Sequence, residues 1–129
     1  MSAMMKVLAW ITGANAALFV FGAVQHAGVA VGPFREPRIV PAAIVEAACG
    51  AALAYAAAAL FRRTPAARRA TIVANAIALA GVIIGLVALA VGAGPRTASN
   101  DLYHRLMLAA IGGSFVLLIV SRRRVRLPV

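Results

Sequence analysis

Four long apolar stretches, separated by short charged segments, dominate the pattern of this chain of 129 residues. They cover about residues 7–31, 40–61, 70–92 and 102–121. About 20 apolar residues suffice for a helix to cross a bilayer, and short connections make neighbouring helices antiparallel. The pattern therefore predicts a single all-α domain over residues 1–129, a polytopic membrane protein that forms an antiparallel bundle of four transmembrane helices.

Composition agrees with this prediction and argues against a soluble domain and a nucleic-acid-binding protein. Hydrophobic residues make up 64% of the chain and charged residues only 12%, whereas a soluble domain carries about a quarter charged residues. The formal net charge is +10, but the basic residues occupy short segments between apolar stretches rather than one folded face. We therefore expect the partners to be the lipid bilayer and other membrane subunits or further copies of this chain, and not nucleic acid.

The basic residues also predict an orientation. The second connection holds four arginines and the carboxyl-terminal tail another four, whereas the first and third connections are nearly balanced. The side of the membrane with more Lys and Arg is generally cytoplasmic. The sequence thus predicts a protein of the plasma or inner membrane with both termini in the cytoplasm.

All three acidic residues and both histidines fall at the opposite, outward end of the predicted spans. These residues are His26, Glu36, Glu46, Asp101 and His104. His26 and Glu46 would each lie about five residues inside a span, roughly 8 Å deep. Because an ionisable group in lipid is costly and marks a functional site by default, we predict that these two side chains are direct or water-bridged partners.

The start of the fourth stretch adds polar residues to this end. Ser99, Asn100 and Asp101 offer helix caps, and Asp101 can pair with Arg105 four residues later. The sequence predicts a ligand-binding or proton-exchanging site, without catalytic or metal-ligating residues, formed by Gln25, His26, Arg38, Glu46, Asp101, Tyr103, His104 and Arg105. Two alternatives stay open: Tyr103, His104 and Arg105 as interfacial anchors, and a polar cluster that only fixes helix register.

Small and polar residues follow helical spacing in three of the stretches. Thr12, Asn15, Gly22 and His26 share one face, and a second face carries Glu46, Cys49, Gly50, Leu53 and Ala57. Gly81 and Gly85 form a G-x-x-x-G step, which allows close helix packing either within a bundle or between two copies.

Several chemistries are compatible with these residues. Two histidines on different helices could ligate haem b as axial ligands. A quinone has fewer structural requirements than haem, because its head group needs one or two hydrogen-bond partners and its tail needs lipid. No nucleophile elbow, phosphate loop or Cys-x-x-Cys motif occurs, so we expect no independent enzymatic activity. A lone cysteine, Cys49, allows no intramolecular disulfide.

Over its whole length the chain resembles the DoxX-like group of small four-span membrane proteins. The resemblance lies in the "QHAG" motif at residues 25–28, in Glu46 at the start of the small-residue second span, and in "NDLYHRLMLAAIGG" at residues 100–113. It implies an accessory or ligand-binding subunit of a membrane redox or stress-related assembly, sometimes linked to quinones.

Two other functions remain as alternatives. A proton-coupled carrier could use Glu46 as its carboxylate. A membrane-embedded transferase is the other, because Arg35, Arg38 and Glu46 echo a pattern of trimeric membrane glutathione transferases.

Overall fold

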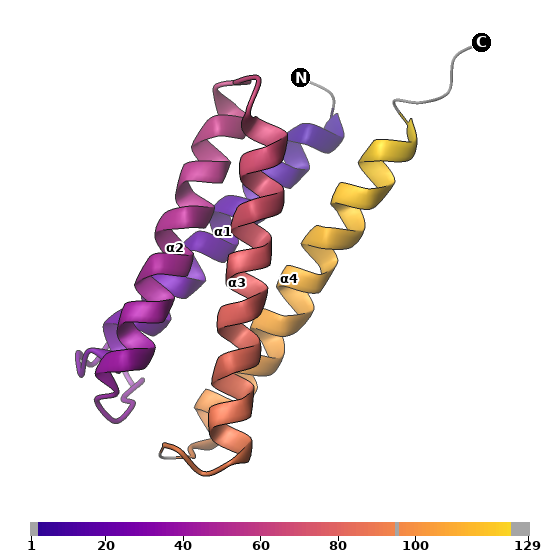
Figure 1. Cartoon of the computed structure of the whole chain (residues 1–129). Coiled ribbons are helices and arrows are strands. Elements are labelled where there is room, and N and C mark those ends of the chain that lie inside the picture. The colour runs from indigo at the N-terminus through magenta and orange to yellow at the C-terminus, as the bar shows by residue number, and fades with distance from the viewer. Residues whose placement is uncertain (1–2, 95, 125–129) are drawn as a thin grey trace.

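The computed structural model describes residues 3–94 and 96–124, with side chains as far as Val120. Its four helices are α1 (Ala3–His26), α2 (Val40–Phe61), α3 (Ala67–Ala90) and α4 (Ala98–Arg124). They run up and down in sequence, so the start of α1 and the end of α4 lie at the same end of the bundle (Figure 1). The predicted all-α, antiparallel four-helix bundle is confirmed.

Several helix boundaries differ from the prediction by three to five residues. α1 ends at His26 rather than at residue 31, because Gly28 adopts a φ of 93° and turns the chain away. α3 and α4 begin at Ala67 and Ala98, earlier than expected. The cap of α4 is Thr97, whose Oγ1 accepts a hydrogen bond from the Asn100 N–H at 3.1 Å. Ser99, Asn100 and Asp101, the predicted caps, lie inside the helix.

Small residues set the packing of the bundle. The interface between α1 and α2 is the largest, and the contact between α1 and α4 is much smaller. A Cβ added at Gly50 would lie 3.0 Å from Val20 Cγ2 and 3.4 Å from the Ala16 carbonyl oxygen, so glycine allows α2 to approach α1 closely. Phe19, Leu53, Met107 and Ile111 fill the centre.

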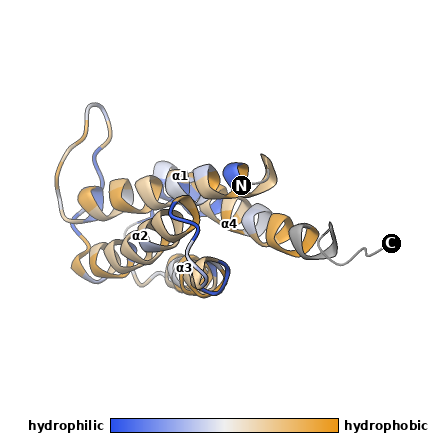
Figure 2. Cartoon of the chain, turned by 90° about the horizontal axis from the view of Figure 1, so that it is seen from above, coloured by the Kyte–Doolittle hydropathy of each residue, from blue (hydrophilic) through white to orange (hydrophobic). Residues whose placement is uncertain are grey.

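The outer surface of the bundle is apolar around all four helices. Figure 2 shows hydrophobic colouring along α1, α2 and α4, and large side chains such as Trp10, Ile84 of α3 and Val116 are exposed. All four helices are long and apolar enough to cross a membrane. Because such a surface suits lipid rather than water, the chain is a small integral membrane protein.

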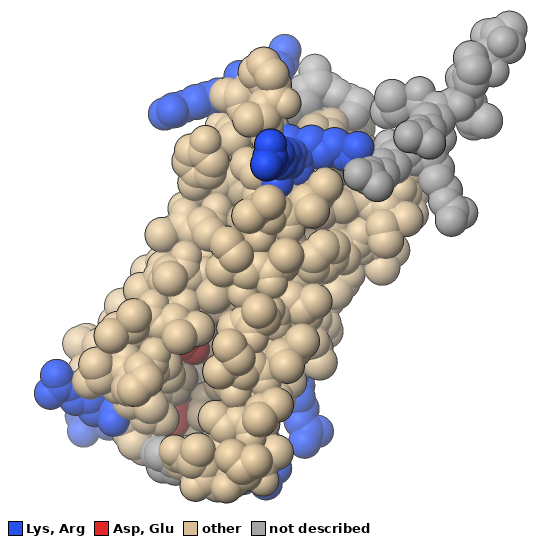
Figure 3. Space-filling model, in the orientation of Figure 1, with Lys and Arg blue, Asp and Glu red and all other residues tan. Residues whose placement is uncertain are grey.

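On the face that Figure 3 shows, the Lys and Arg side chains of the described residues lie at the two ends of the bundle. Lys6 and the four arginines at 62, 63, 68 and 69 lie at the end near the chain termini, here called the basic end. The opposite end, called the polar end, holds the connections 27–39 and 91–97 and every acidic residue. At this end Glu36 Oε2 accepts a hydrogen bond from Thr97 Oγ1 at 2.7 Å, and Oε1 accepts another from the Ser99 hydroxyl. The two connections therefore lie together, as predicted.

Candidate functional site

A buried histidine–glutamate pair forms the centre of the polar end. His26 Nδ1 lies 2.7 Å from Glu46 Oε2. Only 2% of His26 and 6% of Glu46 is exposed. The prediction that these residues are partners is confirmed, and the contact is direct. Each would be costly to bury alone, so the pair accounts for the presence of both in an apolar bundle.

His26 is not buried for the reason that the sequence suggested. It is the last residue of α1, so no further helical turns cover it. Instead, the connection folds back, and the Ile39 N–H donates a hydrogen bond of 2.8 Å to the His26 carbonyl oxygen. Phe34 and Glu36 from this connection and Asn100 from α4 line the space next to the ring. The depth argument was therefore wrong for His26.

The second nitrogen of His26 has unused hydrogen-bonding capacity. Within the described residues, His26 Nε2 is buried with no hydrogen-bond partner, and the same holds for Asn100 Oδ1. Both residues line a cavity of about 80 Å³ together with His104. Since buried polar atoms are normally satisfied, these atoms indicate that the polar end can accept a further polar group.

His104 is oriented by its own helix. Its Nδ1 lies 2.9 Å from the Asn100 carbonyl oxygen, which can only accept, so Nδ1 carries a proton. In the neutral ring Nε2 is then a free acceptor. This atom faces α3, where a Cβ added at Gly85 would overlap it. Gly81, one turn away, leaves room for Cys49 Sγ of α2. The G-x-x-x-G step therefore faces the inside of the bundle.

Tyr103 of α4 contacts α1 next to the His26–Glu46 pair. Its hydroxyl donates a long hydrogen bond of 3.4 Å to the Leu18 carbonyl oxygen. A Cβ added at Gly22 would overlap this hydroxyl and would lie 2.8 Å from Glu46 Oε1. Gln25 is also buried here, and its Nε2 has no hydrogen-bond partner among the described residues. Thus α1, α2 and α4 all contribute to one cluster.

Two larger cavities flank the His26–Glu46 pair. One of about 230 Å³ lies between α2, α3 and α4, with Glu46 and His104 in its wall. The other, of about 240 Å³, lies between α1 and α4 and is lined by Gln25, His26 and Tyr103. Both are somewhat smaller than typical pockets for drug-sized ligands, so each suits a head group rather than a whole amphiphile.

Three predicted site residues lie outside this cluster. Asp101 Oδ2 pairs with Arg105 at 3.6 Å, as expected, and with Arg96 at 3.4 Å. These are surface contacts, since about 72% of the Arg105 side chain is exposed. Arg38 lines an apolar groove on the outer face of α1 and α2. The early end of α1 turns the connection outward and carries Arg38 with it.

The sequence interpretation also missed two polar contributions. Asn100 had been considered only as a cap, yet it is buried beside His26 and His104. Deeper in the bundle, Asn15 Nδ2 donates a hydrogen bond of 3.1 Å to Ser114 Oγ, which links α1 to α4. An amide in an apolar stretch was the available signal, but its partner on another helix cannot be read from spacing.

Haem does not fit these residues. The cavity that His26 and His104 share measures about 80 Å³, which leaves no slot for a macrocycle between the rings. Among the described residues, no group of three His, Cys, Asp or Glu side chains could hold a metal ion. The site offers hydrogen bonds to a small polar group instead.

Comparison with known proteins gives no family for this chain. No protein-family model matches the sequence, and neither characterised proteins nor solved structures give a match.

Proposed function

We propose that this small integral membrane protein binds the head group of a quinone-type amphiphile in the cavity between α2, α3 and α4. The observation that carries the proposal is the position of Glu46 and His104 in the wall of one cavity of about 230 Å³. The rest of that wall is apolar, with Val45, Ile84 and Gly85 among its residues. A polar head group can be held there while its isoprenoid tail extends into lipid.

The hydrogen-bonding groups favour the reduced form of such a ligand. His104 Nε2 is an acceptor in the neutral ring, because Nδ1 carries the proton. The Glu46 carboxylate accepts from His26 Nδ1 through Oε2, and a carboxylate oxygen has a second lone pair that can accept another hydrogen bond. Hydroxyl groups of a quinol donate to both acceptors, whereas the carbonyl oxygens of a quinone cannot. The ligand class is therefore a quinol or a related phenol.

Binding of a reduced quinone analogue tests this function. We expect decylubiquinol, kept anaerobic, to raise the thermal stability of the purified full chain in detergent, and oxidised decylubiquinone to do so less. His104→Leu should weaken quinol binding about tenfold, since it removes one hydrogen bond to the ligand. Asp101→Asn, a surface change at the same end, should bind like the wild type. The proposal would be contradicted if decylubiquinol and decylubiquinone raised the thermal stability equally, or if neither raised it. Unchanged affinity of the His104→Leu variant for the quinol would also contradict it.

The proposal includes a role as an accessory or ligand-binding subunit of a membrane redox or stress-related assembly. The resemblance to DoxX-like proteins supports this role. Purification in mild detergent should then yield a complex with other membrane subunits.

We also propose that the basic end faces the cytoplasm of a plasma or inner membrane, following the distribution of Lys and Arg. In a Cys49→Ser background, Val29→Cys and Ala93→Cys should react with a membrane-impermeant maleimide on intact cells. Thr64→Cys at the basic end should react only after lysis. All three positions are exposed and uncharged, so the substitutions leave the charge bias unchanged. Labelling of Thr64→Cys alone on intact cells would reverse the orientation.

A further inference from the structure

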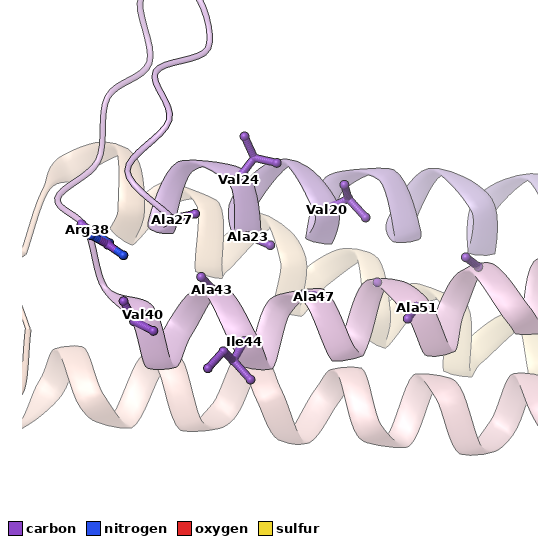
Figure 4. A pocket seen from close by; sticks show the side chains of 12 residues that line it. Val20, Ala23, Val24, Ala27, Arg38, Val40, Ala43, Ile44, Ala47 and Ala51 are labelled. Atoms are coloured by element: carbon purple, nitrogen blue, oxygen red, sulfur yellow. The ribbon is translucent and has the colours of Figure 1, made fainter.

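A long apolar groove lies on the outer face of α1 and α2. Its volume is about 530 Å³, more than twice that of either cavity beside the pair. Figure 4 shows Val20 and Val24 of α1 along one side, Ile44 of α2 along the other, and Arg38 at the end nearest the connection. Arg38 is the only charged side chain among the residues that line it.

The groove follows from small residues at helical spacing on α2. Ala43, Ala47, Ala51 and Ala54 line its length, and Gly50 allows the side chain of Val20 to seat between them. From Val40 to Ala54 the groove extends about 21 Å at the helical rise of ~1.5 Å per residue. One leaflet of the hydrocarbon core is about 15 Å thick. The groove is therefore long enough to take an acyl chain from the headgroup level to the middle of the bilayer.

Arg38 places a positive charge at one end of the groove, so a molecule bound there should carry a negative charge. Its side chain is exposed and packs over Gly28, with Cβ, Cγ and Cδ 3.4–3.6 Å from a Cβ added there. Among the described residues no carboxylate pairs with it. The nearby Glu36 is instead occupied by Thr97 and Ser99. The guanidinium is thus available to an anion at the mouth of the groove, and guanidinium binds phosphate in a two-pronged geometry.

We propose that this groove is a binding site for an anionic phospholipid, with one acyl chain along α2 and the phosphate on Arg38. The argument combines an apolar channel of acyl-chain length, an unpaired cation at headgroup level, and a position on the lipid-facing surface. Basic pockets between transmembrane helices bind anionic head groups in this way. The site is independent of the proposed quinol site, because the two lie on opposite faces of α2 and share no lining residue.

Lipid retention by the purified full chain tests this proposal. The protein is exchanged into detergent micelles that hold equal amounts of phosphatidylglycerol and phosphatidylcholine, and bound lipids are counted by native mass spectrometry. Wild-type protein should retain phosphatidylglycerol preferentially. Arg38→Gln should lower that preference roughly fivefold, the effect of one arginine near an anionic surface. Arg35→Gln removes the same charge from the same connection, outside the groove, and should leave the preference unchanged.

The shape of the groove is tested separately from its charge. Ala47→Phe should fill the groove and reduce retention of both lipids, whereas Ala48→Phe, also exposed but outside the groove, should not. Retention in the supplied proportions by wild type would overturn the proposal, as would equal losses in Arg38→Gln and Arg35→Gln. A second copy could cover the groove instead. Disulfide-linked dimers of Ala47→Cys in a Cys49→Ser background would show that arrangement and overturn the lipid site.

Discussion

Glu46→Ala is expected to lower the free energy of unfolding by about 3 kcal/mol, because it leaves a buried imidazole without its partner. His26 Nδ1 has no other hydrogen bond in the described part of the chain, and only 2% of the residue is exposed. Glu46→Gln keeps an oxygen that can accept from Nδ1 and should cost clearly less. Unfolding of the purified protein by sodium dodecyl sulfate in mixed micelles measures both values.

A double-mutant cycle of Glu46→Ala and His26→Ala measures the coupling free energy between the two residues. His26→Ala should also be destabilising, and the double variant should lose about 1–2 kcal/mol less than the sum of the single losses. Asp101→Asn is the matched control, since Asp101 makes only surface ion pairs at the same end. Its effect should stay within about 0.5 kcal/mol. Additive losses from Glu46→Ala and His26→Ala would show that the contact of 2.7 Å contributes nothing to stability.

The number and direction of the helices could be predicted from the sequence, but one boundary could not. Residues 27–31 are apolar and continue the first stretch without interruption, so hydropathy extends the helix through them. The backbone leaves the helix at Gly28, where φ is 93°, and a glycine inside an apolar run does not reveal this by itself. Conversely, Arg68 and Arg69 lie in the first turn of α3, although their charge suggested a loop.

The pair at the centre of the site could be predicted because only a few residues are able to ionise. With one carboxylate inside an apolar stretch, Glu46, and one histidine near the same end of the neighbouring apolar stretch, partnership is the solution that avoids isolated burial. Arg38 and Asn100 could not be assigned in this way. The path of a connection decides whether Arg38 faces the pair or the lipid, and the start of α4 decides whether Asn100 is a cap or a buried side chain.

The glycines that face the cluster link its geometry to the packing of the helices. Gly22 of α1 lies against Tyr103 of α4 and Glu46 of α2, and Gly85 of α3 lies against His104. Each of these polar side chains therefore occupies space that is free only because the facing helix carries a glycine, which has no Cβ. It follows that the site should be sensitive to the smallest possible addition at these glycines, even though no hydrogen-bonding atom is removed.

Gly22→Ala is the sharpest test of this dependence and is expected to lower the free energy of unfolding by about 1–3 kcal/mol, the usual cost of overpacking. The added Cβ would overlap the Tyr103 hydroxyl and would lie 2.8 Å from Glu46 Oε1. Either the carboxylate or the tyrosine ring must then move, which should also weaken binding of decylubiquinol.

Gly113→Ala in α4 is the control, because a Cβ there meets no atom within 4 Å. Alanine in a helix is favoured over glycine by about 0.5–1 kcal/mol, so this variant should be as stable as wild type or more so. Equal effects from the two substitutions would mean that α1 and α4 do not meet at Gly22 as closely as the cluster requires.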